Sequence, residues 1–167
     1  MSYRGRAHVL GDDVNTDYIT PTDYFGEPIE TIAEHLFEPV DPDFTERFDP
    51  GDVVVAGTNF GSGSSRETAP KAMHVAGVSA VVAESFARIF YRNCIAIGLP
   101  VIVCPGVTDG VETGDAVAVD LGEGVVTNET TGATFDGESM PDAVQERFDA
   151  GGLVAHFEQQ PDGLRGG

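Results

Sequence analysis

The middle of the chain alternates short apolar runs with amphipathic stretches, a pattern typical of β-α-β-α-β units. The apolar runs predict strands at residues 52–57, 78–83 and 100–104. The stretches between them predict helices at residues 70–76 and 86–97, and each of these is followed by a glycine suited to a helix C-terminus. Such an order favours parallel pairing of the strands with right-handed crossovers.

The C-terminal part of the chain has a different pattern. Residues 115–139 contain three short β-like runs separated by glycine-containing turns, and residues 142–157 have a helical pattern interrupted by Gly151 and Gly152. No Pro/Ser-rich linker divides the 167 residues. We therefore expect one mixed α/β domain over residues 1–167, with a small, mostly parallel core and additional antiparallel strands.

The charge of the chain narrows the possible partners. Its 28 acidic and 9 basic residues give a formal net charge of −19, which argues against nucleic acid because a phosphate backbone needs basic contacts. The normal apolar content indicates a folded protein of a halophile rather than a disordered acidic chain. Residues 60–105 carry a net +2 and the remainder −21. In that segment Arg88 and Arg92 share one helix face, as a solvated stripe or a surface for a partner.

Neither a membrane segment nor a metal site is predicted from the sequence. The N-terminus has no apolar stretch of signal-peptide length, and nowhere do about eighteen apolar residues run together. We expect a soluble, cytoplasmic protein. Cys94 and Cys104 are ten residues apart, without a second pair of metal ligands beside either. Two cysteines cannot hold a structural zinc or an iron–sulfur cluster alone, and we expect both to be buried core residues.

The stretch GTNFGSGSSRETAP, residues 57–70, joins a predicted strand to a predicted helix. Backbone N–H groups at a helix start attract an anion. A Walker loop would end in Gly-Lys-Ser/Thr, whereas here Arg66 follows two serines. A dinucleotide-binding fingerprint would have a third glycine at that position, and a nucleophile elbow needs a serine at the centre of G-x-S-x-G. None of these three motifs fits.

The remaining interpretation is a carboxylate site. Arg66 can bind a carboxylate through two parallel hydrogen bonds, and Ser64 and Ser65 add hydroxyl donors. The alternative is a capping box formed by Ser64 and Glu67, which would leave the arginine unexplained. Since a proline inside a helix costs a backbone hydrogen bond, we expect the helix itself to start at Pro70.

Three motifs together resemble a known family. They are DDVNTDYITP at residues 12–21, NFGSGSSRE at 59–67 and SFARIFYRNCIAIGLP at 85–100. In this order they resemble the small subunit of isopropylmalate dehydratase, which is similar to the swivelling domain of aconitase. The resemblance covers residues 7–157, and archaeal small subunits are similar in length to this chain. It implies a swivelling β/β/α domain.

The resemblance also implies chemistry shared between two chains. A large subunit would carry a [4Fe–4S] cluster as Lewis acid, and this chain would bind no metal. Ser64 would accept the proton from carbon, while Arg66 and Ser65 would hold a substrate carboxylate. Asp17 would orient Ser64 or Arg66, although its stretch is also turn-forming sequence. A serine is a poor base unless its alkoxide is stabilised, which fits a position among N–H groups beside an arginine.

Substrate choice is expected to depend on the segment Tyr24, Phe25, Gly26 and Glu27. Relatives whose substrates carry an extra carboxylate have an arginine in this segment. This chain has no arginine between Arg6 and Arg47. An aliphatic arm is therefore favoured. Isopropylmalate is the expected substrate, with citramalate or dimethylmalate next and homoaconitate less favoured.

Several features stay open at this stage. Thr68 replaces a histidine that many relatives have, and Ser62 replaces a frequent cysteine. The histidines match no catalytic position and are expected to be structural or exposed; they are His8, His35, His74 and His156. A different class of function, a binding module whose glycine loop captures a phosphate or nucleotide without chemistry, remains the alternative.

Overall fold

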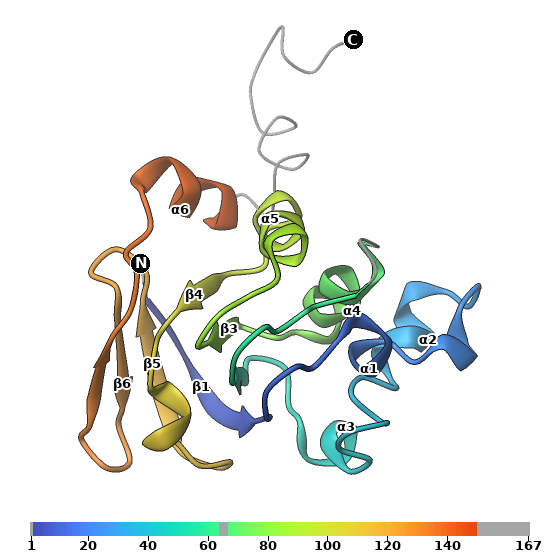
Figure 1. Ribbon diagram of the computed structural model, residues 1–167, viewed down its shortest axis with the longest axis horizontal. Coiled ribbons are helices and arrows are strands. Elements are labelled where there is room, and N and C mark those ends of the chain that lie inside the picture. The colour runs from blue at the N-terminus through green and yellow to red at the C-terminus, as the bar shows by residue number, and fades with distance from the viewer. Residues whose placement is uncertain (1, 64–66, 150–167) are drawn as a thin grey trace, which may run out of the picture.

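A computed structural model describes residues 2–63 and 67–149 (Figure 1). Seven strands form one mixed sheet in the order β4-β3-β2-β1-β5-β6-β7. The strands are β1 (Ser2–Val9), β2 (Val53–Ala56), β3 (Ala80–Ala83), β4 (Val101–Val103), β5 (Ala116–Asp120), β6 (Val125–Asn128) and β7 (Thr134–Asp136). The strands expected at 52–57, 78–83, 100–104 and within 115–139 are confirmed, with shorter bounds.

Strand β1 joins the two halves of this sheet. Its residues 2–6 pair antiparallel with β5, and its residues 7–9 pair parallel with β2. The parallel half continues from β2 through β3 to β4, and the antiparallel half from β5 through β6 to β7. The expected parallel core with added antiparallel strands is confirmed, but the sequence did not reveal that β1 connects them.

Six α-helices and two short 3-10 turns accompany the sheet in the described residues. They are α1 (Thr16–Ile19), η1 (Thr22–Tyr24), α2 (Ile29–Ala33), α3 (Phe44–Arg47), α4 (Thr68–Ala76), α5 (Arg88–Ile97), η2 (Val107–Asp109) and α6 (Asp142–Asp149). Helices α4 and α5 connect the parallel strands and end at Gly77 and Gly98, both at φ 96°. The predicted C-terminal glycines are therefore confirmed. Of the helix expected at 142–157, only its first part lies in the described region.

The start of α4 corrects two expectations. The helix begins at Thr68 rather than at Pro70, and its first α-helical hydrogen bond runs from Lys71 N to Glu67 O at 3.1 Å. Pro70 is tolerated because the amides of the first turn have no partner within a helix. The capping-box alternative also placed Glu67 inside the first turn, while its other member, Ser64, lies outside the described residues. Glu67 stands directly before the helix instead of in its first turn, and its side chain makes no capping bond.

The core lies on both faces of the parallel strands. Every residue of β2 and β3 is buried. In Figure 1 the antiparallel strands lie to the left and helices α1 to α4 to the right, with the parallel strands between them. Among the described residues, no helix is long and apolar enough to cross a membrane. This arrangement leaves the ends of the parallel strands as the place where loops from different parts of the chain meet.

Candidate active site

The segments that follow β1, β2 and β3 converge at one edge of the sheet. These strands are parallel, so their carboxyl ends lie side by side, where α/β proteins commonly bind ligands. Residues 10–16 leave β1, residues 57–63 leave β2 and residues 84–87 leave β3. The three motifs that carry the family resemblance therefore meet here.

The glycine-rich loop at residues 57–63 is fastened to the segment after β1. Six hydrogen bonds of 2.8–3.2 Å join them: Gly57 N to Gly11 O, Asp13 N to Thr58 O, Gly61 N to Val14 O, Thr16 N to Ser62 O, Thr58 N to Asp12 Oδ1, and Asn59 Nδ2 to Asp13 Oδ1. Four of the six use backbone groups alone, so most of the pairing does not depend on side chains. The loop thus has a fixed position against the start of α1.

On its other side the same loop is fastened to the segment after β3. Phe60 N donates to Ser85 O at 3.1 Å, and Ala87 N donates to Phe60 O at 2.9 Å. Asn59 N donates to the Ser85 hydroxyl oxygen at 2.8 Å. The loop is therefore hydrogen bonded to the segment after β1 as far as Ser62 and to the segment after β3 as far as Phe60.

Asp13 and Asn59 are the non-glycine residues of this edge with left-handed backbones, at φ 56° and 57°. The Asn59 side-chain amide donates to Asp13 Oδ1 at 3.2 Å. Asp and Asn adopt this conformation more readily than other L-residues. Strained backbones cluster at functional sites. Both residues lie in motifs recognised in the sequence, and two polar residues tolerant of positive φ were a usable signal, but this pair was not predicted.

Two glycines permit the close approach of neighbouring segments. A Cβ on Gly57 would lie 1.8 Å from Asp12 Oδ1, the atom that accepts the Thr58 N–H. A Cβ on Gly61, which has φ +85°, would lie 2.1 Å from Phe90 Cγ. Phe90 is buried on the inner face of α5. The loop therefore packs directly against α5, and no side chain fits at these two positions.

The predicted catalytic and carboxylate-binding residues Ser64, Ser65 and Arg66 lie outside the described residues. Their flanks are described on both sides. A Cβ built on Gly63 would lie 3.4 Å from Thr16 Oγ1, so the loop passes α1 at this point. One residue after Glu67, α4 begins. The described chain thus stops beside α1 at Gly63 and resumes directly before α4 at Glu67.

Asp17 lies in α1, the helix next to the loop. Its neighbour Thr16 donates its backbone N–H to Ser62 O at 2.9 Å. Asn15, not Asp17, caps the helix, because its Oδ1 accepts the Tyr18 N–H at 3.0 Å. The Asp17 side chain is exposed and makes no hydrogen bond to another described residue. The structure therefore brings Asp17 close to the loop and gives it no capping role.

The segment expected to set substrate choice follows α1. The Tyr24 ring stacks on His35, with ring centroids 3.8 Å apart, and its hydroxyl donates to Glu38 Oε1 at 3.2 Å. Phe25, Gly26 and Glu27 are exposed, and Gly26 has φ +90°. Tyr24 therefore anchors the turn to the segment before α3, and the three residues after it face solvent.

A buried polar network joins the last residues of β1 to the start of β2. His8 is 1% exposed, and its Nε2 lies 2.7 Å from Asp52 Oδ2. Arg47 Nε donates to His8 Nδ1 at 3.2 Å, so the ring proton is on Nε2 and is donated to Asp52. Burial alone would raise the pKa of Asp52, but hydrogen bonds from His8, the Asp49 N–H and Arg6 outweigh burial and lower it. This network is structural.

The other histidines fit the same expectation where they are described. His35 Nδ1 lies 2.6 Å from Glu38 Oε2, and His74 is exposed in the last turn of α4. His156 is not among the described residues.

Both cysteines are buried, free thiols. Burial raises the pKa of Cys94 well above its ordinary value and that of Cys104 to about 11. A cluster ligand must be a thiolate that the metal can reach. Within the described ranges, no three His, Cys, Asp or Glu side chains are grouped to hold a metal ion. These residues do not fit an iron–sulfur cluster.

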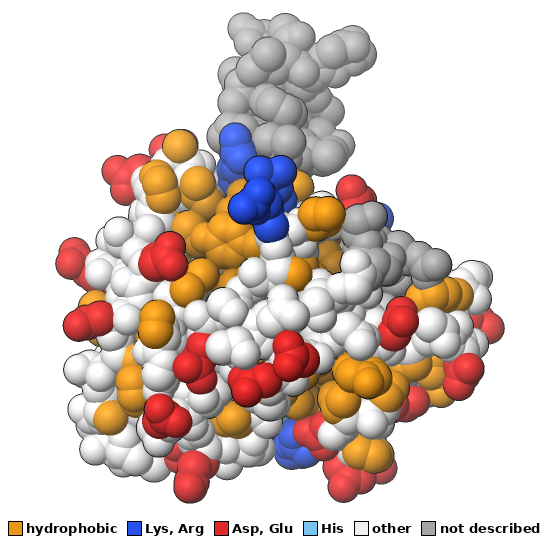
Figure 2. All heavy atoms as spheres, in the orientation of Figure 1, with side chains coloured by type: hydrophobic (Ala, Val, Ile, Leu, Met, Phe, Trp, Pro, Cys, Tyr) orange, Lys and Arg blue, Asp and Glu red, His pale blue; other side chains and the backbone are white. Residues whose placement is uncertain are grey.

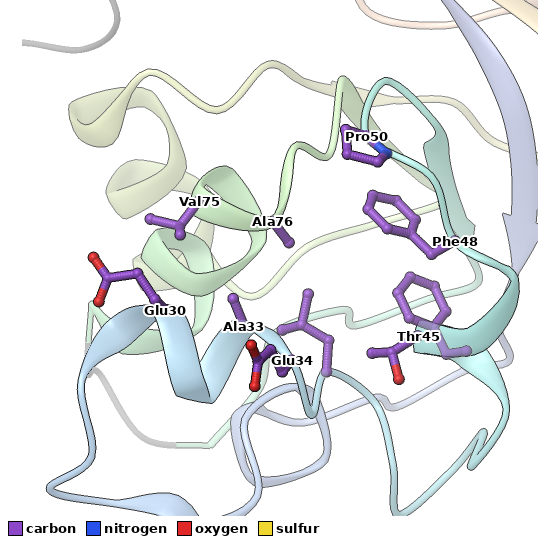
Figure 3. A pocket seen from close by; sticks show the side chains of 10 residues that line it. Glu30, Ala33, Glu34, Thr45, Phe48, Pro50, Val75 and Ala76 are labelled. Atoms are coloured by element: carbon purple, nitrogen blue, oxygen red, sulfur yellow. The ribbon is translucent and has the colours of Figure 1, made fainter.

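A hollow of about 520 Å³ lies at the other end of the parallel strands (Figure 3). Its lining comes from α2, α3, the turn before β2 and the end of α4, and is mostly apolar. The charged side chains that line it are Glu30 and Glu34. Because both would repel a carboxylate, this hollow is not a site for an acidic substrate.

Comparison with known proteins gives the family. Residues 34–105 match the aconitase C-terminal domain. The chain is 48% identical over 164 residues to 3-isopropylmalate dehydratase small subunit 2 of Archaeoglobus fulgidus, covering 97% of this chain and 98% of that protein. It is 46% identical over 159 residues to the 2,3-dimethylmalate dehydratase small subunit of Eubacterium barkeri, covering 94% and 97%.

A solved structure agrees with these relatives. The crystal structure of 3-isopropylmalate dehydratase (LeuD) from Methanocaldococcus jannaschii superposes with a TM-score of 0.87 at 41% identity, and the match covers 95% of both chains. Fold and sequence therefore agree over nearly the whole chain. The resemblance seen in the sequence is confirmed: this chain belongs to the family of 3-isopropylmalate dehydratase small subunits, whose fold is the C-terminal swivel domain of aconitase.

Proposed function

We propose that this chain is the small subunit of a two-chain hydro-lyase that interconverts 2-isopropylmalate and 3-isopropylmalate by dehydration and rehydration, a step of leucine biosynthesis. One observation carries the proposal. The loop at 57–63 is hydrogen bonded on one side to residues 10–16 and on the other to residues 85–87. Relatives named 3-isopropylmalate dehydratase small subunit support the reaction.

The reaction needs a base for a carbon-bound proton and a cation for a carboxylate. We assign the base to Ser64 and the carboxylate contact to Arg66 and Ser65. Support comes from the flanks of these residues, since the chain passes α1 at Gly63 and enters α4 after Glu67. Backbone N–H groups at a helix start favour negative charge, which includes a substrate carboxylate and a serine alkoxide. Asp17, one residue from the contact with the loop, is the proposed positioning residue.

The Lewis acid must come from another chain. Cys94 and Cys104 are buried with raised pKa values and do not fit cluster ligation. We therefore assign a [4Fe–4S] cluster to the partner large subunit, where it would polarise the substrate hydroxyl. The part of this chain is to supply the base, to hold a carboxylate and to exclude water when the two subunits close over the substrate.

The variable arm of the substrate is proposed to be aliphatic. Among residues 24–27 the side chains are a tyrosine that is hydrogen bonded to Glu38, an exposed phenylalanine and an exposed glutamate. A second carboxylate at this turn would meet negative charge and no arginine. 2,3-Dimethylmalate is the second candidate, since a relative of similar identity is named for it.

A reconstitution assay tests the proposal. The purified chain is mixed with its cognate large subunit loaded with iron and sulfide, and the unsaturated intermediate formed from 2-isopropylmalate is followed by its ultraviolet absorbance. We expect turnover only when both chains are present. The kcat/KM values for 2-isopropylmalate, citramalate, 2,3-dimethylmalate and homocitrate then show which variable arm of the substrate the enzyme prefers. Nucleotide or phosphate binding without turnover would support the binding-module alternative instead.

Single variants then separate the roles. Ser64→Ala should lower kcat by about 10²–10⁴-fold without affecting assembly, which is the usual range for a lost general base. Arg66→Lys should instead raise KM, because lysine cannot form the two parallel hydrogen bonds of a guanidinium. A Ser64→Ala enzyme with nearly normal kcat would show that another group takes the proton.

A further inference from the structure

Helix α5 has an outer face that differs from the rest of this acidic molecule. Phe90 and Cys94 face the core. The opposite face exposes Arg88, Ile89 and Arg92. At 53%, Ile89 is the most exposed of the large hydrophobic residues in the described part of the chain. Figure 2 shows basic side chains gathered over α5 beside a hydrophobic patch, while acidic side chains are scattered over the rest of this view.

The two arginines are not used within the described structure. Neither Arg88 nor Arg92 forms an ion pair or hydrogen bond with another described residue, although the protein has a formal net charge of −19. By contrast, Arg6 and Arg47 are each paired with aspartates. Two cations on one helix face next to an exposed isoleucine, in a chain so rich in carboxylates, are available to a partner.

This face is continuous with the candidate active site. A hollow of about 520 Å³ beside α5 is lined by Ser85, Phe86, Arg88, Tyr91, Val103 and Glu138. Ser85 is also the residue whose hydroxyl accepts the Asn59 N–H of the glycine-rich loop. A partner that covers the loop to complete the site would therefore extend over this hollow and the first turns of α5.

We propose that the outer face of α5, defined by Arg88, Ile89 and Arg92 with the adjoining hollow, is the docking surface for the large subunit. This inference rests on the proposed function, which requires that subunit. The fitting surface presents carboxylates to Arg88 and Arg92 and an apolar side chain to Ile89. Opposite charges set the orientation and speed of association, while a central apolar contact contributes much of the affinity.

Two variants with matched controls test the docking surface. Arg92→Glu reverses a charge on the α5 face, and Arg4→Glu makes the same change at a 73% exposed side chain on β1. Ile89→Ser removes the apolar contact, and Val75→Ser does so at a 45% exposed valine on α4. The measured quantity is the Kd for the large subunit by titration calorimetry, after circular dichroism has shown that each variant is folded.

We expect Arg92→Glu and Ile89→Ser to raise the Kd on the order of tenfold or more, and the controls to change it by about twofold or less. At saturating small subunit, kcat should stay near the wild-type value for both α5 variants. Unchanged affinity for both α5 variants, or equal losses in variants and controls, would overturn the docking surface. So would self-association of the isolated chain that Arg92→Glu abolishes, because a second copy would then occupy this face.

The same experiment separates this inference from the proposed function. If the wild-type small and large subunits bind each other but do not dehydrate 2-isopropylmalate, the proposed function is wrong. The Kd values of the variants still decide where the large subunit docks. If the two subunits catalyse the reaction and the α5 variants bind as tightly as wild type, the function stands and the docking surface is wrong.

Discussion

Asn59 Nδ2 donates a hydrogen bond of 3.2 Å to Asp13 Oδ1, and both residues have left-handed backbones. Asp13 follows β1 and Asn59 follows β2, so the bond joins the first turns after two neighbouring parallel strands. The Asn59 backbone N–H is bonded to Ser85 Oγ after β3. This residue therefore links three segments five positions before the proposed base.

Replacing Asn59 should affect stability and catalysis separately. Asn59→Gly keeps the positive φ and removes the side-chain bond, so we expect a small change in stability and a clear loss of kcat. Asn59→Ala should in addition lower the free energy of unfolding by about 1–2 kcal/mol, because alanine is strained in a left-handed backbone. Urea unfolding and steady-state kinetics of the reconstituted enzyme measure the two effects. A normal kcat in Asn59→Gly would show that the bond does not position the loop.

The contact between Gly61 and α5 allows a second prediction. Gly61→Ala places a Cβ 2.1 Å from Phe90 Cγ at φ +85°, whereas Gly114→Ala has φ +100° and no atom within 4 Å of its Cβ. Gly114→Ala should cost about 1–2 kcal/mol from the backbone alone. Gly61→Ala should cost about 1–3 kcal/mol more, since Phe90 or the loop must move. Urea unfolding of the two variants gives the difference directly, and equal losses would mean that the packing adjusts freely.

The fold was predictable wherever the apolar pattern was strong. Strands β2 and β3 are buried on both faces and appear in the sequence as continuous apolar runs. Strand β1 was not predicted because its first half is only half-buried and contains Arg4, Gly5 and Arg6. Helices α1, α2 and α3 have only four or five residues, too few for a 3.6-residue period to show.

The motifs of the candidate site were predictable from the sequence, but the hydrogen bonds that join them were not. The sequence placed an anion loop after β2, since glycines before a helix have a known physical meaning. It could not show that residues 10–16 and 84–87 flank that loop, because most of the joining hydrogen bonds use backbone atoms. The roles of Asp13 and Asn59 depend on those long-range contacts. The start of α4 was misplaced because proline was expected at the first helical position instead of the third.

The lowered pKa of Asp52 predicts a loss of stability in acid. A carboxyl whose folded pKa lies below its unfolded value stabilises the fold fully above the unfolded pKa, which for Asp is 3.8, and loses this contribution as the pH falls through the folded pKa. Asp52→Asn should therefore lower the free energy of unfolding by about 1–3 kcal/mol at pH 7. The difference from wild type should shrink below pH 3.8.

Asp49→Asn is the matched control for that experiment. Asp49 also pairs with Arg6, at 3.1 Å, but its side chain is 77% exposed, so its loss should change stability little. Urea unfolding between pH 2 and pH 7 compares the three proteins. A constant gap between wild type and Asp52→Asn over this range would contradict a titrating role for the carboxyl.

The buried thiols predict slow chemical modification. With the pKa of Cys104 at about 11 and that of Cys94 well raised, almost no thiolate exists at pH 8, and neither sulfur is accessible. Iodoacetamide should label neither cysteine in the native chain and both in urea, as mass spectrometry would show. Treated chain should reconstitute normal activity with the large subunit. Rapid labelling of the native chain would contradict the buried positions.

The turn at residues 24–27 predicts that substrate choice can be changed by one charge. Glu27 is exposed, and no arginine lies near it in sequence to bind a carboxylate on the variable arm. Glu27→Arg should raise kcat/KM for homocitrate relative to 2-isopropylmalate by about tenfold or more, the usual worth of a hydrogen bond to a charged group. Steady-state kinetics with both substrates measures this ratio.

Glu30→Arg makes the same charge change on α2 and is the control for the Glu27 variant. Glu30 lines the hollow at the other end of the parallel strands, so its replacement alters the net charge without placing a cation in the turn. If the turn contacts the arm, only Glu27→Arg changes the ratio, because a direct hydrogen bond requires the guanidinium at that position. Equal changes in the two variants would mean that long-range attraction of a more acidic substrate, and not contact at residues 24–27, decides which arm is accepted.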